Sequence, residues 1–189
     1  MKRFLRPLLS LIILSYLGYI TWFLATAYQI PYPRTHFPVV VVGIDLVDIC
    51  IHEAGHLFFS PLGYMPQLVG GALMQIMLPL ITLLVLLNTS NRTLAFTLYW
   101  LGHNLANIAV YIADAPHLRL RMYSFHGLHD WFMVFTQLRL LGSAGDIAKI
   151  VLYVGLASCI IGIGIGLYFV ILDFSGLWRP ESYLPKGNQ

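Results

Sequence analysis

Five long apolar runs constrain this chain more than any other feature of its sequence. They cover residues 7–27, 39–59, 68–87, 94–113 and 147–172. A helix needs about 20 predominantly apolar residues to cross the hydrocarbon core of a bilayer. Only 10% of the residues are charged, against about 25% in an average soluble protein. The sequence therefore predicts an all-α integral membrane protein with about five transmembrane helices, formed by residues 1–189 as a single domain.

Two further segments add to this prediction. Residues 131–141 are apolar but too short to cross, so we expect a short interfacial or re-entrant helix there. The first run follows a basic N-terminal segment and ends in Ala-Thr-Ala at residues 25–27, a pattern that also fits a cleaved signal peptide. The length and the aromatic residues of this run favour an uncleaved helix, and both interpretations of residues 1–27 remain open.

The basic residues predict an orientation for the chain. With five crossings, seven Lys and Arg residues fall on the side of the N-terminus and four on the other side. Because basic loops are retained in the cytoplasm, the N-terminus is predicted to be cytoplasmic, in a membrane such as the bacterial inner (plasma) membrane. The net charge of +3 is small and scattered, and it gives no indication of a nucleic-acid partner.

The second run contains the sequence H-E-A-G-H at residues 52–56. Histidines at positions i and i+4 share one face of a helix, and two imidazoles placed in this way can bind one zinc ion. Glu53 stands between them and can take a proton from an activated water molecule. The pattern therefore predicts a catalytic zinc site with His52 and His56 as ligands and Glu53 as general base. Hydrogen-bonded core histidines are the alternative, but they would leave many buried polar atoms to satisfy.

Two polar stripes indicate where the rest of the site lies. The first stripe covers about 80° of arc on the helix of the second run and consists of Asp45, Asp48, His52 and His56. The second stripe follows 3, 4, 3 spacing on the fourth run and consists of Asn104, Asn107, Tyr111 and Asp114. Polar groups at membrane depth almost always face the interior of a helix bundle. We therefore expect the two stripes to face each other.

A catalytic zinc ion usually has three protein ligands and one open position. Asp114 is the first choice for the third ligand, because the fourth run ends on the membrane side where the second run ends. His129 is the competing choice, and whichever of the two is not a ligand would orient the one that is. A helix-end carboxylate in water remains the alternative for Asp114. His103 lies nearer the middle of its helix and is predicted to be a polar packing residue.

These motifs resemble those of the intramembrane zinc metalloproteases of the site-2 protease type, over roughly residues 39–115. The resemblance rests on H-E-A-G-H in a membrane helix, on the glycines of the hairpin at residues 70–79, and on the aspartate two helices downstream. In site-2 proteases that aspartate stands in a Leu-Asp-Gly context, whereas here Ala residues flank Asp114. The chain also resembles a group of small bacterial membrane proteins that carry H-E-x-G-H, "YIADA" and "HDW".

The resemblance implies hydrolysis of a peptide bond near the cytoplasmic face, in a membrane protein or peptide substrate within the lipid bilayer. Two other classes of function fit the same residues. One is a membrane metal hydrolase acting on a non-peptide amphiphile, because the motif specifies activated water and not the bond attacked. The other is a non-enzymatic metal-binding or assembly protein of the membrane. Substitution of Glu53 by Gln separates this last class from both enzymes.

Overall fold

The computed structural model describes residues 2–26, 38–86, 91–120 and 129–175. Within these ranges the chain is helical apart from short connections. In chain order the elements are α1 (Lys2–Thr26), α2 (Val39–Phe59), the 3-10 turn η1 (Ser60–Leu62), α3 (Tyr64–Leu86), α4 (Asn91–Asp114), α5 (Asp130–Leu138), the 3-10 turn η2 (Leu141–Ser143) and α6 (Ala144–Ser175).

Each of the five predicted runs coincides with one long helix, and the short helix expected at residues 131–141 is found as α5. Among the described residues, three helical stretches are long and apolar enough to cross a membrane, namely Leu5–Thr26, Tyr64–Leu86 and Leu141–Ser175. The α2 helix differs from these three because it carries three acidic residues within its 21 positions. The all-α membrane prediction is therefore confirmed with three candidate spans, and five spans are not confirmed.

The helices α2, α3, α4 and α6 alternate in direction. Gly55 of α2 packs against Gly70 of α3, which closes an antiparallel hairpin through η1. The guanidinium of Arg92, at the start of α4, donates to both carboxylate oxygens of Asp173, at the end of α6, at 2.9 and 2.6 Å. A bidentate pair of this kind fixes the register of two helices as well as their contact.

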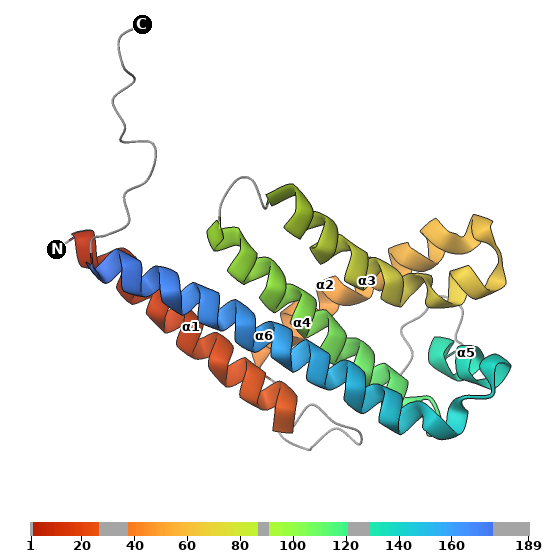
Figure 1. Ribbon diagram of the computed structural model, residues 1–189. Helices are drawn as coiled ribbons and strands as arrows, with labels where there is room; N and C mark the ends of the chain where they lie inside the picture. The colour runs from red at the N-terminus through yellow and green to blue at the C-terminus, as the bar shows by residue number, and fades with distance from the viewer. Residues whose placement is uncertain (1, 27–37, 87–90, 121–128, 176–189) are drawn as a thin grey trace, which may run out of the picture.

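The direction of α1 differs from the prediction. The start of α1 lies beside the end of α6 (Figure 1), and Leu14 packs against Gly166 further along the pair, so α1 and α6 are antiparallel. Five successive crossings would make these two helices parallel. This arrangement also places the basic start of α1 at the opposite end of the bundle from Arg119 and Lys149. The charge asymmetry from which the cytoplasmic N-terminus was predicted therefore no longer favours one end.

Small residues allow α4 and α6 to approach closely. A Cβ atom added at Gly155 would lie 2.8 Å from the carbonyl oxygen of Gly102, and one added at Gly162 would lie 2.7 Å from that of Ala95. Contacts this short exclude any larger side chain without movement of the backbone, as is typical of membrane helices that pack through small residues. The glycine stripe on α6 therefore holds α4 in the middle of the bundle.

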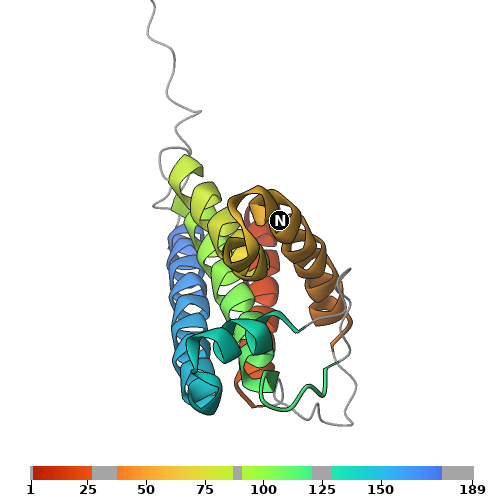
Figure 2. The same cartoon turned by 90° about the vertical axis from the view of Figure 1, so that its right-hand side faces the viewer.

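Buried polar side chains concentrate on α2, α3 and α4, and large hydrophobic side chains are exposed on all of the long helices. The buried set on these three helices consists of Asp48, His56, Gln75, Thr97, His103, Asn104, Asn107 and Asp114. Figure 2 shows α5 lying across the end of the bundle where α4 ends. The two predicted polar stripes thus face the interior, and α5 covers one end of the space between them.

The orientation of α1 can be measured with single cysteines at Arg6 and His117 in a chain whose Cys50 and Cys159 are replaced by Ala. If α1 and α6 are antiparallel, these two positions lie at opposite ends of the bundle. A membrane-impermeant maleimide applied to intact cells should then label only one of them. Labelling of both, or of neither, would instead support five alternating crossings. A cysteine at Gln137, on α5, is the control and should behave as His117 does.

Candidate metal centre

Three side chains from two helices converge at the end of the bundle that α5 covers. The Nε2 atoms of His52 and His56, on α2, each lie 3.3 Å from Oδ2 of Asp130, the first residue of α5. The atoms that these three residues can offer to a metal ion all lie within 4.8 Å of one another. The structure therefore brings together two imidazole nitrogens and a carboxylate oxygen, which is a ligand set that zinc accepts.

The distances are compatible with a metal site. Charge-assisted hydrogen bonds between nitrogen and carboxylate oxygen usually measure about 2.7–2.9 Å. Two ligand atoms at about 2.1 Å from a tetrahedral zinc ion lie about 3.4 Å apart. The separations of 3.3 Å between Asp130 and the two histidines are close to the edge of such a tetrahedron, and the one from His52 also meets the criterion for a long hydrogen bond.

Hydrogen bonds on the far side of each imidazole fix which nitrogen faces the centre. Nδ1–H of His52 donates to Oε1 of Gln75 at 2.9 Å, and Nδ1–H of His56 donates to the carbonyl oxygen of Gln67 at 2.7 Å. The amide of Gln75 in turn donates to Oδ1 of Asn107 at 3.3 Å. Both Nε2 atoms therefore carry lone pairs, as ligation requires.

One of these nitrogens bears on whether the residues fit a metal ion. His56 is 3% exposed, and its Nε2 atom has no hydrogen-bond partner within the part of the chain that the structure describes. A buried polar atom without a partner is costly. A zinc ion bound by His52, His56 and Asp130 would satisfy it, so the residues present fit the ion that the sequence predicted.

Glycines of α3 make room for the histidines. A Cβ atom added at Gly71 would lie 2.5–2.6 Å from three atoms of the His52 imidazole. On the neighbouring turn, a Cβ atom added at Gly55 would clash with the carbonyl of Gly70 and would lie 2.8 Å from Cβ of Met74. Gly55 and Gly70 therefore bring α2 and α3 into contact, and Gly71 leaves the space in which the His52 ring lies.

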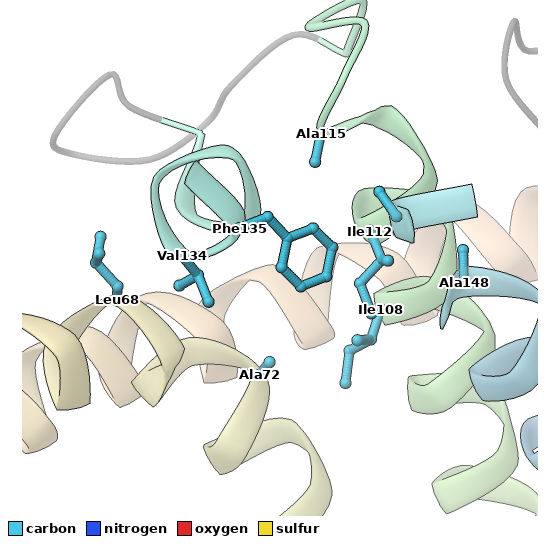
Figure 3. Packing of buried hydrophobic residues seen from close by; sticks show 9 residues of the cluster. Leu68, Ala72, Ile108, Ile112, Ala115, Val134, Phe135 and Ala148 are labelled. Atoms are coloured by element: carbon cyan, nitrogen blue, oxygen red, sulfur yellow. The ribbon is translucent and has the colours of Figure 1, made fainter. Parts of the chain in front are cut away.

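Asp130 is held in place by the packing of its own helix. Figure 3 shows Val134 and Phe135 of α5 pointing into an apolar cluster that α3 and α4 line. The other labelled members of this cluster are Leu68, Ala72, Ile108, Ile112, Ala115 and Ala148. Burial alone would raise the pKa of Asp130, but the neighbouring imidazoles of His52 and His56 lower the pKa to about 2. Asp130 is thus a fixed, ionised carboxylate.

The structure places Asp114 and His129 beside the centre and not in it. Both oxygens of Asp114 accept backbone hydrogen bonds at 2.9 Å, from the amides of Arg119 and Leu120. The Nδ1 atom of His129 accepts from the amide of Phe132 and so caps α5. The Nε2 atom of His129 then faces Asp114 at 3.4 Å. These two residues connect the start of α5 to the end of α4, and Asp130 stands where we expected one of them.

Burial lowers the pKa of the His129 imidazole, although the negative charges of Asp114 and Asp130 act in the opposite direction. A neutral His129 suits its two contacts, because one nitrogen accepts from a backbone amide while the other faces a carboxylate. Its role in the structure is therefore to orient the start of α5.

Sequence reasoning did not select Asp130 as a ligand. The relevant feature was the "HDW" segment, in which His129 and Asp130 precede the short apolar run. From the sequence, Asp130 was expected at most to orient His129. The composition of the connection from α4 to α5 does not determine where α5 lies, so it could not predict that Asp130 reaches His52 and His56.

Glu53 lies next to His52 on α2 and is half-buried. Tyr111 lies between the two sides of the site, with its ring 6.2 Å from that of His52 and 6.3 Å from that of His129.

Comparison with known proteins adds no relative: no family model matches this chain, nor does any curated protein or solved structure. The interpretation of the site therefore rests on its own geometry.

The assignment of the third ligand can be tested by zinc affinity, measured in competition with a chromophoric chelator. Asp130→Ala should weaken zinc binding by more than the roughly 10–100-fold that is typical of a residue that only orients a ligand. Asp114→Asn should fall within that range, because it disturbs His129 and α5 without removing a ligand. A larger loss for Asp114→Asn than for Asp130→Ala would make Asp114 the ligand.

The space left by Gly71 gives a second test. Gly71→Ala should displace the His52 ring and weaken zinc binding roughly tenfold or more, as other changes around a metal ligand do. Gly164→Ala is the matched control, since a Cβ atom there meets nothing within 4 Å and the change should leave zinc affinity unaltered. Equal zinc affinities for these two variants would show that zinc binding does not depend on the present position of the His52 ring.

Proposed function

We propose that this chain is an intramembrane zinc metallopeptidase. The observation that carries the proposal is the convergence of His52, His56 and Asp130, with both histidine Nε2 atoms turned toward the same carboxylate oxygen. Three protein ligands leave one tetrahedral position open, which is the arrangement of catalytic and not of structural zinc sites. Glu53 in the H-E-A-G-H segment, whose charge acts on His56, is the proposed base.

The division of labour follows from the chemistry of each group. Zinc, when bound, supplies a Lewis acid that polarises a carbonyl group and lowers the pKa of water. Glu53 accepts the proton of the attacking water molecule and returns it to the departing amine. Gln75 and Gln67 keep the two histidines in the ligating tautomer through their Nδ1 hydrogen bonds. Asn107 holds Gln75 in turn.

The described residues do not bury the three converging side chains equally. The side chains of His52 and Asp130 are 15% and 12% exposed, whereas that of His56 is 3% exposed. The open side therefore lies toward His52 and Asp130, at the end of the bundle where α2 and α4 end. Water and an unwound segment of a membrane protein can both approach such a position.

The proposal includes a membrane arrangement. We propose that α2 and α4 lie at membrane depth beside the three more apolar spans, because their polar side chains point inward and their outer faces expose residues such as Val47, Leu57 and Phe96. An ionisable stripe is tolerated at membrane depth when it faces the bundle interior. The substrate would then be a peptide bond close to one membrane face.

Glu53→Gln tests the catalytic part of the proposal. The variant should bind zinc as the wild type does, since Glu53 is not among the three converging ligands. Peptide cleavage should fall by roughly 10²–10⁴-fold, the usual effect of removing a general base. Cleavage can be followed without a known substrate by labelling new N-termini in membranes from cells that express either chain, with His117→Gln as control.

Each outcome of this experiment is informative. New termini that depend on Glu53 support a peptidase. If no termini differ but an amphiphile is released from the same membranes only by the wild type, the enzyme hydrolyses a non-peptide bond. If Glu53→Gln keeps both zinc and the biological function of the chain, the protein is a non-enzymatic metal-binding protein and the proposal fails.

A further inference from the structure

A second group of ionisable side chains lies deeper in the bundle. Asp45 and Asp48 of α2 and His103 of α4 offer ligand atoms that all lie within 4.8 Å of one another. His103 is 1% exposed and Asp48 is fully buried. The midpoint of the two aspartates lies roughly 11 Å along the α2 axis from that of His52 and His56, at 1.5 Å per residue. This group is therefore separate from the metal centre described above.

The hydrogen bond of His103 determines which of its two ring nitrogens carries a lone pair in the neutral imidazole. Nδ1–H donates to Oδ2 of Asp48 at 3.1 Å, so Nε2 carries the lone pair in the neutral imidazole. That lone pair faces Oδ1 of Asp45 at 3.7 Å, which is too long for a hydrogen bond. Two electron-rich atoms that face each other repel unless a positive group lies between them. A metal ion fits there, since ligands of one tetrahedral zinc ion lie about 3.4 Å apart.

Two atoms of the group lack partners among the described residues. Nε2 of His103 and Oδ1 of Asp48 have no hydrogen-bond partner within the described ranges of the chain. Both belong to side chains that are almost completely buried. Leaving such atoms unpaired costs free energy, and leaving a charge unpaired costs more.

The surroundings increase this cost. Asp48 and His103 also line a groove of about 630 Å³ whose other walls are mainly apolar residues of α1, α2 and α4. Charges interact strongly in such a low-dielectric setting, and water is a poor substitute for a counter-ion there.

We infer that Asp45, Asp48 and His103 form a second divalent cation site. Its mixture of one imidazole and two carboxylates suits zinc or a similar transition-metal ion better than magnesium or calcium, which prefer oxygen ligands alone. Asp48 either ligates through Oδ1 or holds the imidazole from behind, as carboxylates commonly do beside zinc-bound histidines. His103 is thus a ligand, which goes beyond the packing role predicted from its sequence position. The inference does not depend on peptidase activity.

The test is the zinc content of the purified full-length protein in detergent, measured by elemental analysis after removal of loosely bound metal. The wild type should contain two zinc ions per chain. His52→Ala combined with His56→Ala should retain one, and His103→Gln added to that pair should remove it. His117→Gln is the control for adventitious binding to an exposed histidine and should retain two.

Two results would overturn the inference. One is a complete loss of zinc in the His52→Ala and His56→Ala variant, provided that its circular dichroism and gel filtration match those of the wild type. The other is a wild-type zinc content in His103→Gln. Because the double-histidine variant keeps the second group intact, the answer does not depend on whether His103→Gln folds. Either result leaves the first centre, and the peptidase proposal, untouched.

Discussion

The polar face of α2 is the constraint on which the rest of the structure depends. A helix in an apolar bundle cannot turn two aspartates and two histidines toward lipid, so every neighbouring element must help to cover them. The side chains that contact this face come from three helices: Gln75 of α3, His103 of α4 and Asp130 of α5. Asn107 of α4 contacts the face indirectly, through Gln75. The order of the helices around α2 follows from that requirement.

Close packing and polar contact support each other in this arrangement. Glycines at the α2–α3 and α4–α6 contacts let the backbones approach until larger side chains no longer fit. That approach brings His52 within reach of Gln75 and keeps α4 against α6. The apolar cluster beneath α5 then holds the start of this short helix, so the position of Asp130 depends on Val134 and Phe135 as much as on its own contacts. A carboxylate at the start of a nine-residue helix would otherwise be poorly fixed.

Much of the architecture could be predicted from local pattern. The apolar runs predicted the helices because length and hydrophobicity act within each segment, and the i, i+4 histidines predicted a shared face because helix geometry fixes it. The third member of the metal centre could not be predicted in the same way. Asp114 and Asp130 are both carboxylates at helix ends, and the sequence contains nothing that says which of them turns toward His52. Asp114 instead accepts two backbone amides from the turn that follows α4.

The sequence by itself determined the helical class of this protein, its membrane character, and the placing of His52, Glu53 and His56 on one short stretch of helix. These properties depend on composition and on contacts over a few residues. Only the tertiary structure decided that α1 is antiparallel to α6, that Asp130 joins the two histidines, and that His103 meets Asp45 and Asp48. These features join residues that lie 55–152 positions apart in the sequence. Such contacts depend on how whole helices pack, and packing is settled by the shapes of many side chains at once.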